Sequence, residues 1–470
     1  GYEILECDTE ILFQQLQEKE GNEYFLALRE TPFYTESGGQ VGDIGVVELR
    51  QFGETFPVSR AFKTGDGSVI HVLPSFSDRG VGAVVHARID IPRRHNIERN
   101  HTATHLVHEA LRRVLGTHAH QQGSLVAPDH LRFDFNHFEK ITADQLKAIE
   151  EIVNDKVGQS IDVCALNDPK EWLTIEDAKR KYPNVKMFFG EKYGERVRVV
   201  EVDPRFSVEL CGGTHVRNTK EIGLFKIVSE SGIASGIRRI EAVTGEGLNQ
   251  YIQKRVEKTG ELDSQLERLL QEKEDLERQL GQYMKVQPSS RPSLGAVSFS
   301  PVPASREMIE AVEQAAHRRE ETIEQVTKSM HDLKKELSKY RVKDASSGFN
   351  EMIAGGVSVN GIKVVSAKIE AGSVEELKDL GDTLRAGISS GVGVLGAVID
   401  QKVALVCVVT DDLIRDKKLQ AGKIVGELAK QVGGGGGGRP HLATAGGKDI
   451  SKLDATLGQV AGIVRSMVSG

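Results

Sequence analysis

Residues 96–115 read NIERNHTATHLVHEALRRVL, and this stretch sets the character of the central part of the chain. Its apolar residues recur at the spacing of a helix that buries one face, and Gly116 follows where such a helix ends. The periodic positions are Ile97, Leu106, Val107, Ala110, Leu111 and Val114. His101 and His105 stand four residues apart, so a helix places both imidazoles on one face.

A second short stretch supplies two more candidate metal ligands. Residues 211–215 read CGGTH and bring a thiol and an imidazole close together in a glycine-rich segment. Zinc prefers nitrogen and sulfur ligands in a tetrahedron. Because the two pairs are far apart in sequence, they meet only if one domain folds them together. We therefore predict one Zn²⁺ per chain, held by His101, His105, Cys211 and His215.

The four-ligand set leaves the role of the metal open. The residue after His101 is Thr102, so the helix lacks the glutamate of the HExxH metalloproteases. A catalytic zinc keeps one position open for water or substrate, whereas four protein ligands close the tetrahedron. Either one ligand is displaced, or the zinc holds the substrate, or the metal is structural.

Composition narrows the class of protein. The chain has 470 residues, 27% charged and 39% hydrophobic, which is typical of a soluble protein of about two to four domains. We expect no membrane span, since no apolar run reaches about 18 residues, and no signal peptide. Four cysteines make no disulfide scaffold and fit a cytoplasmic setting. The net charge of −7 argues against a nonspecific DNA-coating protein without excluding a local basic surface.

The sequence of the first half of the chain predicts two units of a multidomain α+β protein. Residues 1–93 read as short strands and turns, including the glycine-rich stretch YTESGGQVGD at 34–43, and predict a small β-barrel. Residues 94–247 mix helix and strand around the ligand pairs and predict an α/β zinc domain. Within it we expect a strand at 132–135 and a helix at 146–157.

Residues 248–344 change to a heptad pattern, the period of a coiled coil. The first run is Leu262, Leu266, Leu269, Lys273, Leu276, Leu280 and Tyr283, and the second is Ile323, Val326, Met330, Leu333, Leu337 and Tyr340. A helix-breaking linker, QPSSRP at 287–292, separates the runs. The simplest interpretation is an antiparallel helical hairpin that connects two globular parts. A dimerising rod is the alternative.

Residues 345–470 predict a second globular unit of α/β type. Buried-strand runs at 361–367 and 403–409 alternate with amphipathic helices. Its unusual feature is the glycine run 433–438, which precedes Arg439 and a proline. A glycine loop brings backbone N–H groups close to a phosphate, and an arginine adds charge. A flexible linker is the alternative.

Taken together, these motifs resemble the alanyl-tRNA synthetase family. The two ligand pairs, the glycine-rich stretch 34–43, the stretch ASGIRRIE at 234–241 and the glycine run occur in the family's order along the whole chain. The resemblance is to the family's C-terminal half: the editing domain, a helical connector and a C-terminal DHHA1-like domain. We expect the ATP-dependent aminoacylation core to precede residue 1.

The resemblance implies an aminoacyl-tRNA deacylase. The family's editing domain hydrolyses the ester of tRNA(Ala) mischarged with serine or glycine, and its zinc ligands fall on the four residues named above. The C-terminal domain is implied to bind tRNA, and the hairpin or that domain to support a homodimer. One alternative is a free-standing long editing protein. Another is a non-catalytic tRNA-binding and dimerisation module with a structural zinc.

We expect polar neighbours of the ligands to line the editing pocket. They are Thr102, Thr104, Gln121, Gln122, Gly38, Gly39, Gln40 and Thr214. The resemblance places a pocket glutamine at Gln121. A dedicated partner for the serine hydroxyl would reject an analogue without it by about 10⁴-fold. For contact with the tRNA backbone the candidates are Gly435, Gly436, Arg439 and Lys448.

Overall fold

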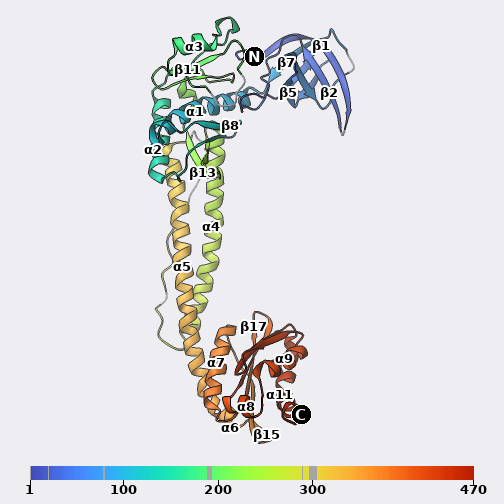
Figure 1. Ribbon diagram of the computed structural model, residues 1–470, viewed down its shortest axis with the longest axis vertical. Helices are drawn as coiled ribbons and strands as arrows, with labels where there is room; N and C mark the ends of the chain where they lie inside the picture. The colour runs from blue at the N-terminus through green and yellow to red at the C-terminus, as the bar shows by residue number, and fades with distance from the viewer. Residues whose placement is uncertain are drawn as a thin grey trace. The chain divides into compact units, whose positions relative to one another are not determined.

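The computed structural model describes residues 2–19, 21–77, 80–187, 193–287, 289–295 and 304–469. The chain divides into two compact units, Gly1–Gly260 with Gly295–Ala316, and Glu261–Leu294 with His317–Gly470. Both mix helices and sheets, so the multidomain α+β class is confirmed (Figure 1). Among the described helices, none is both long enough and apolar enough to cross a membrane.

Seven strands form one sheet at the start of the first unit. They are β1 (Glu6–Lys19), β2 (Gly21–Leu28), β3 (Gly45–Leu49), β4 (Glu54–Val58), β5 (Arg60–Lys63), β6 (Val69–Leu73) and β7 (Val84–Ile89). Their order is β4-β3-β7-β1-β2-β6-β5, and the sheet curls into a nearly closed, barrel-like form (Figure 1). Ile11, Val47 and Ala87 are fully buried inside it. The structure thus has a nearly closed, barrel-like sheet where a small β-barrel was predicted.

The helix α1 (Ile91–Leu115) contains the predicted helix at 96–115 and extends it toward the N-terminus. The Asp90 carboxylate caps it by accepting the backbone N–H of Arg93, and a proline occupies the first turn. Leu106 and Leu111, two of the periodic apolar positions, are fully buried. The periodicity of the sequence therefore identified the buried face of α1.

Two small sheets surround α1. The first has the order β13-β14-β9-β8, with β8 (Gln121–Val126), β9 (Leu131–Asn136), β13 (Lys226–Ala234) and β14 (Ile237–Val243). The second has the order β10-β11-β12, with β10 (Cys164–Ala165), β11 (Val199–Asp203) and β12 (Ser207–Leu210). The helices are α2 (Ala143–Gly158) and α3 (Ile175–Lys181), with short 3-10 turns at Pro169–Glu171 and Thr219–Ile222. The strand at 132–135 and the helix at 146–157 are confirmed within β9 and α2.

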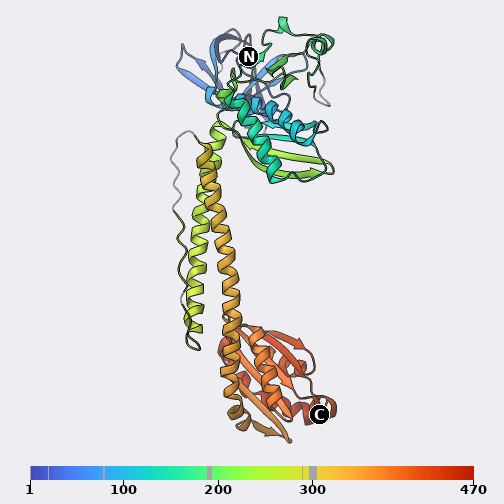
Figure 2. The same cartoon turned by 90° about the vertical axis from the view of Figure 1, so that its left-hand side faces the viewer.

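Two long helices follow, α4 (Gly245–Leu280) and α5 (Arg306–Ser347). They lie side by side in both views (Figure 1 and Figure 2). In the second unit Asp263 pairs with Arg319, and Gln279, further along α4, bonds Arg341, further along α5. Because the residue numbers of the contacting pairs increase together along both helices, the two helices run parallel. The predicted antiparallel direction is therefore wrong.

The connection between the helices explains their direction. Ser289 donates to Glu277, and Arg291, further along the chain, bonds Glu274 and Glu267, which come earlier in α4. The chain thus runs back along α4 before α5 begins, whereas an antiparallel pair needs only a short connection. Of the predicted linker 287–292, Pro288 lies outside the described residues.

The heptad residues of the second unit form one buried seam within the chain. The seam contains Leu266, Leu270, Leu276, Leu280, Val326, Met330 and Leu337. Six of these seven are positions of the predicted heptads; Leu270 is the exception. The apolar repeat therefore packs α4 against α5 of the same chain, as expected of a hairpin but with the opposite direction.

The C-terminal part of the second unit is a six-stranded sheet in the order β15-β16-β17-β18-β20-β19. The strands are β15 (Val357–Val359), β16 (Ile362–Lys368), β17 (Gly391–Ile399), β18 (Lys402–Val409), β19 (Gly435–Gly438) and β20 (Leu442–Gly447). The helices are α6 (Phe349–Ala354), α7 (Val374–Gly387), α8 (Asp411–Asp416), α9 (Ala421–Gln431), α10 (Leu453–Gly458) and α11 (Val460–Ser469). Leu405 faces the core of α9 and α11, and Val406 faces that of α7, so helices cover both faces.

The glycine run corrects a second expectation. Instead of a loop, Gly435–Gly438 forms the edge strand β19, which pairs antiparallel with β20. A Cβ on Gly436 would collide with the Cβ of Ala445, whereas one on Gly435 would meet open space. The two strands thus approach more closely than side chains on both would allow, and glycine permits that approach.

Candidate metal centre

The structure brings the four predicted ligands into one cluster. His101 and His105 come from α1, and Cys211 and His215 from the segment that follows β12. Their ligand atoms all lie within 4.8 Å of one another. The Cys211 Sγ lies 3.4 Å from Nε2 of His101 and 3.4 Å from Nε2 of His215. The cluster is able to hold a metal ion.

Local backbone geometry positions the thiol. The N–H of Cys211 donates to the carbonyl of Arg198 (3.1 Å), which continues the pairing of β12 with β11. The N–H of Gly213 then points back at the Cys211 Sγ (3.4 Å). A Cβ on Gly213 would collide with the imidazole of His101, so only glycine lets this turn approach α1.

Each histidine has a partner at Nδ1 that fixes its ring. The pairs are His101 with Gln40 Oε1 (2.6 Å), His105 with Glu209 Oε2 (3.3 Å) and His215 with Thr102 Oγ1 (3.1 Å). In metal sites such partners select the tautomer and leave the other ring nitrogen for the ion. The three Nε2 atoms are therefore the ring nitrogens left available for an ion.

The electrostatics of the cluster suit metal binding. Burial lowers the pKa of His101 and of His215 well below the ordinary value. Burial also lowers the pKa of His105, although Glu209 opposes the shift. The lowered pKa values favour the neutral imidazole, which is the form that binds metal. Three imidazoles and one thiol are a donor set that zinc prefers, so the residues fit the ion that the sequence predicts.

Glu209 is a positioning residue that the sequence reasoning missed. Burial opposes ionisation of its carboxyl, but His105, Lys186 and His108 outweigh burial and lower its pKa. Lys186 Nζ lies 3.3 Å and His108 Nδ1 3.2 Å from Glu209 Oε1. The signal in the sequence was an acidic residue inside an apolar strand, two positions before Cys211.

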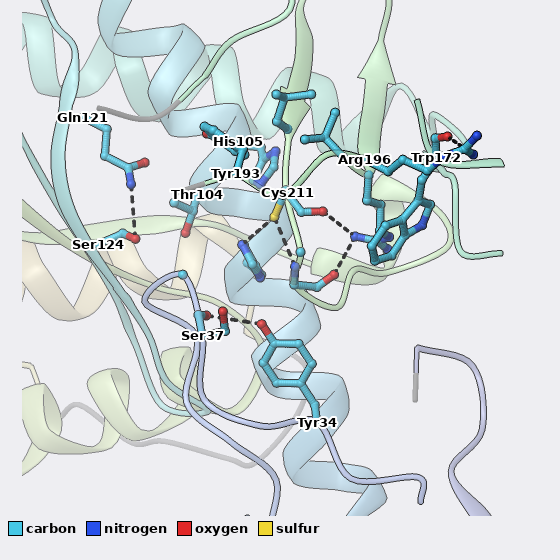
Figure 3. A pocket seen from close by; sticks show the side chains of 18 residues that line it. Tyr34, Ser37, Thr104, His105, Gln121, Ser124, Trp172, Tyr193, Arg196 and Cys211 are labelled. Carbon is cyan, nitrogen blue, oxygen red and sulfur yellow. Dashed lines mark hydrogen bonds between the residues drawn. The ribbon is translucent and has the colours of Figure 1, made fainter. Parts of the chain in front are cut away.

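A cavity of about 330 Å³ adjoins the cluster. His101, His105 and Cys211 line one side of it, together with Thr104 of α1. The rest of the lining comes from the 34–43 stretch, β8 and the second small sheet with its neighbouring loops. Figure 3 shows side chains from these segments around the cavity, with Tyr34, Ser37, Gln121, Ser124 and Trp172 among the labelled residues.

The predicted pocket residues divide into two groups. Thr104, Gln121 and Gly38 line the cavity. Gln121 Nε2 donates to Ser124 Oγ (3.4 Å), while Gln121 Oε1 is buried and has no hydrogen-bond partner among the described residues. Gln122, by contrast, is exposed and bonds Asn136, so it lies away from the cavity.

The remaining predicted pocket residues lie behind the ligands. Gln40 is fully buried and donates to Thr214 Oγ1 (3.0 Å) while accepting from the Thr214 N–H (2.8 Å). Thr102 accepts from the backbone N–H of Val216 (3.2 Å) as well as contacting His215. A Cβ on Gly39 would collide with the backbone of Ser124. These residues hold the cluster and the 34–43 stretch in place.

Arg198 is a buried cation beside the cluster that the sequence reasoning also missed. Its Nη1 donates to the carbonyls of Cys211 (2.9 Å) and Gly213 (2.8 Å), and its Nη2 to Asn167 Oδ1 (2.6 Å). Burial lowers the pKa of Arg198. The alternation RVRVVEV at 196–202 was the available signal, since it puts an arginine among buried strand residues.

The candidate tRNA contacts lie in the second unit. Gly435 and Gly436 are exposed in β19. Arg439 lies in the turn from β19 to β20, and Lys448 directly follows β20. Both side chains are exposed. Because Gly438 pairs with Ala443 near one end and Gly435 with Gly446 near the other, the two cations flank opposite ends of this ladder.

Comparison with protein families gives three matches. Residues 197–241 match the threonyl and alanyl tRNA synthetase second additional domain, which covers β11, β12, two ligands and most of β14. Residues 361–466 match the DHHA1 domain, and residues 1–93 match the class II (A) tRNA synthetases.

The chain also aligns along its whole length with curated proteins. It is 40% identical over 478 residues to the alanine–tRNA ligase of Acetivibrio thermocellus, covering 100% of this chain and 48% of that protein. It is 37% identical over 477 residues to the alanine–tRNA ligase of Thermoanaerobacter sp. strain X514, with 100% and 48% covered. The chain thus spans about half the length of these relatives.

Among solved structures, the C-Ala domain of Aquifex aeolicus alanyl-tRNA synthetase is 27% identical. The match covers 24% of this chain and 98% of that chain, with a TM-score of 0.22, too low to support a structural argument. The family assignment rests on the sequence matches. With identities near 40% along its entire length, the chain belongs to the alanyl-tRNA synthetase family.

Proposed function

We propose that this chain is the editing part of an alanyl-tRNA synthetase and hydrolyses the ester of tRNA(Ala) mischarged with serine or glycine. One observation carries the proposal. Three of the four clustered donors, His101, His105 and Cys211, also line the 330 Å³ cavity. A zinc that only stabilised the fold would have no need of such a cavity. The donors supply a metal-bearing wall for a substrate group.

The chain's own residues account for binding and orientation. Zinc held by these donors would supply a Lewis acid for the aminoacyl group, with one donor displaced or a fifth ligand added to give the substrate a position. Trp172 and Tyr34 offer apolar surface to the terminal nucleoside of the tRNA. The buried guanidinium of Arg198 holds the Cys211 and Gly213 carbonyls in place, and its positive charge beside the cavity would favour negative charge developing on the ester oxygen.

Gln121 provides the basis for choosing serine over alanine. Its Oε1 is buried, and it has no hydrogen-bond partner within the described part of the chain. A serine hydroxyl can donate to this oxygen, whereas an alanine methyl leaves it unsatisfied at a cost of about 1–3 kcal/mol. With glycine, water can fill the remaining polar space. The pocket thereby disfavours alanine without relying on size.

The test is hydrolysis of seryl, glycyl and alanyl esters of tRNA(Ala) by the chain, with and without a zinc chelator. We expect the seryl and glycyl esters to be cleaved, the alanyl ester to be spared, and chelation to abolish cleavage. Hydrolysis that survives complete zinc removal would overturn the metal's role. Zinc binding without any hydrolysis would favour a tRNA-binding module with structural zinc.

A matched pair of variants tests the specificity argument. Gln121→Leu should slow hydrolysis of the seryl ester by about tenfold or more, because it removes the acceptor for the hydroxyl. Gln122→Leu makes the same change at the neighbouring exposed position and should have no effect. Equal seryl rates in the two variants would sink the role of Gln121.

We further propose a division of labour along the chain. Residues 1–93 and 94–247 edit, residues 248–344 connect, and residues 345–470 bind tRNA. Exposed glycine backbone in β19, flanked by Arg439 and Lys448, supports the last assignment. Replacing both cations with glutamine should weaken tRNA binding and flatten its salt dependence. Equal affinity and slope would count against this contact.

We also propose that the protein acts in the cytoplasm, as its sparing use of cysteine suggests. A free-standing editing protein and an editing region within a longer synthetase would share the site described here. The ester assay on this chain alone measures whether the region edits without further domains.

A further inference from the structure

The first unit has a second cavity, of about 500 Å³, that the proposed chemistry does not use. Four basic side chains line it, from Arg112, Arg113, Lys186 and Arg205, whereas the lining residues include one carboxylate, Glu109. The whole chain carries a net charge of −7, so this cavity is a local excess of positive charge in an acidic protein.

The arginines at this cavity are held in place. The Arg113 guanidinium lies 4.3 Å from the centroid of the Phe206 ring and donates to the carbonyl of Arg205 (3.0 Å). Arg112 donates to the carbonyl of Thr117 (2.8 Å). Stacking on an aromatic ring leaves the N–H edge of a guanidinium available for an oxyanion. Arg113 nevertheless keeps 45% of its side chain exposed, so a ligand can reach it.

The charges already present do not neutralise the cavity. Lys186 is shared between Glu109 (2.9 Å) and the buried Glu209 (3.3 Å). Glu109 also faces Arg113 (3.1 Å) and Arg112 (3.9 Å). Arg205 lies in the turn between β11 and β12 and is exposed. Four cations against two carboxylates leave an excess of two positive charges, which an anion would balance.

The basic cavity is a neighbour of the metal centre along α1. His105 lines the first cavity, and His108, about one turn further along the helix, lines the second. The Glu209 carboxylate joins them, since its two oxygens contact His105 and His108. A polyanionic strand whose end enters the metal cavity would therefore lie near the basic side chains of the second cavity.

We propose that this basic cavity binds a backbone phosphate of the RNA whose aminoacyl end occupies the metal cavity. The inference rests on the proposed function for its substrate, an aminoacylated tRNA. Guanidinium groups bind phosphate oxygens through paired N–H donors, and phosphate contacts fix the register of a nucleic acid without reading its sequence. The cavity thus positions the acceptor arm for hydrolysis.

The experiment compares two double variants of the full chain. Arg113→Gln with Arg205→Gln removes two cations from the cavity. Arg29→Gln with Arg60→Gln removes two exposed arginines of the barrel, each with one surface ion pair. Binding of an uncharged RNA minihelix with the acceptor stem of tRNA(Ala) is measured across salt concentrations, and inorganic phosphate is added as a competitor. Thermal unfolding verifies that each variant folds.

We expect the cavity variant to bind the minihelix about tenfold more weakly, with a salt slope flatter by about 0.7 to 0.9, the value for one lost phosphate contact. The barrel variant should match the parent chain in affinity and slope. In ester hydrolysis, the cavity variant should lose activity through KM rather than through kcat. If the double variant does not fold, Arg205→Gln alone should show about half of the change in slope.

Two results would overturn the inference. The first is unchanged minihelix affinity and slope in the cavity variant. The second is saturation of the cavity by submillimolar phosphate with no effect on the minihelix, which identifies a site for a free anion. Failure of the proposed function gives a different pattern, because the minihelix would still bind through these arginines while no ester is cleaved.

Discussion

The metal centre of the first unit and the glycine strand of the second build a surface in opposite ways. In the metal centre, buried polar side chains such as Gln40 and Glu209 hold the ligand rings. In β19 the residues are glycines, which have no side chains, so backbone atoms form the surface. The first region depends on a few side-chain contacts, such as the Gln40 hydrogen bond to His101 and the Glu209 ion pair with His105, and the second on a close approach of two strands.

The two regions are therefore destabilised by different kinds of substitution. A buried polar network fails when one member is removed, because its partner is left unsatisfied. A glycine strand has no polar side chain to lose, but it does not tolerate an added methyl group on its crowded side.

The largest effect should come from Cys211→Ala, which removes the thiolate from the cluster. We expect zinc content after dialysis to fall from about one per chain to none, and seryl ester hydrolysis to fall by more than about 100-fold. Cys164→Ala removes an exposed cysteine of the same unit and should change neither quantity. A variant that retained zinc and rate would exclude Cys211 as a ligand.

Next is Asp43→Ala, which breaks a buried ion pair. The Asp43 carboxylate accepts from the fully buried Arg94 guanidinium and from the Tyr34 N–H (2.7 Å), so it ties the 34–43 stretch to α1. We expect a loss of about 3–5 kcal/mol in the free energy of unfolding of the first unit. Fluorescence of Trp172, the chain's sole tryptophan, reports on that unit in a urea titration.

The exposed pair of Glu23 with Arg60 provides the control for Asp43. Both side chains are largely exposed, at 42% and 57%. Glu23→Ala should cost less than about 1 kcal/mol. Similar costs for the two variants would show that the buried network is no more sensitive than the surface, and would remove the basis of the contrast.

Glu209→Gln should have a smaller effect, because the ligands remain. The carboxylate orients His105, and its loss should weaken zinc affinity by about 10- to 100-fold. Competition with a chelator of known affinity measures this directly. Glu201→Gln, on the adjacent strand β11, is the control and should leave affinity unchanged. Unaltered affinity in Glu209→Gln would mean that the ring is held by packing alone.

The glycine strand supplies the last pair of variants. Gly436→Ala adds a methyl group that collides with Ala445 and should destabilise the β19–β20 ladder by about 1–3 kcal/mol. Gly435→Ala adds the same group into open space and should cost less than about 0.5 kcal/mol. Hydrogen exchange of the β20 amides reports both values. Equal protection in the two variants would refute the packing account.

Local patterns in the sequence predicted much of the fold. The period of residues 96–115 identified α1, and the heptads identified α4 and α5. The direction of α5 relative to α4 was predicted wrongly, because a heptad repeat is the same whether the partner helix runs parallel or antiparallel. The long stretch between Tyr283 and Ile323 was the signal for a returning chain, since antiparallel helices are joined by short connections.

The candidate site shows the same division. The clustering of the candidate ligands His101, His105, Cys211 and His215 was predicted from residue type and spacing, because zinc chemistry admits few donors. The residues that orient the histidine rings could not be predicted in the same way. Gln40 was expected in the pocket but lies behind His101, and Glu209 went unrecognised. Each contacts a ligand far away in the chain, so no local pattern records the pairing.

Residue spacing and composition alone predicted the elements: a small β-barrel, a helix with two candidate metal ligands, two heptad helices and a glycine-rich C-terminal unit. The tertiary structure decided which way α5 runs, that the glycines form an edge strand, and which polar groups satisfy the buried histidines. The physical reason is that periodicity and composition act between near neighbours. Burial gives most polar groups a partner, and that partner is set by the folded chain as a whole.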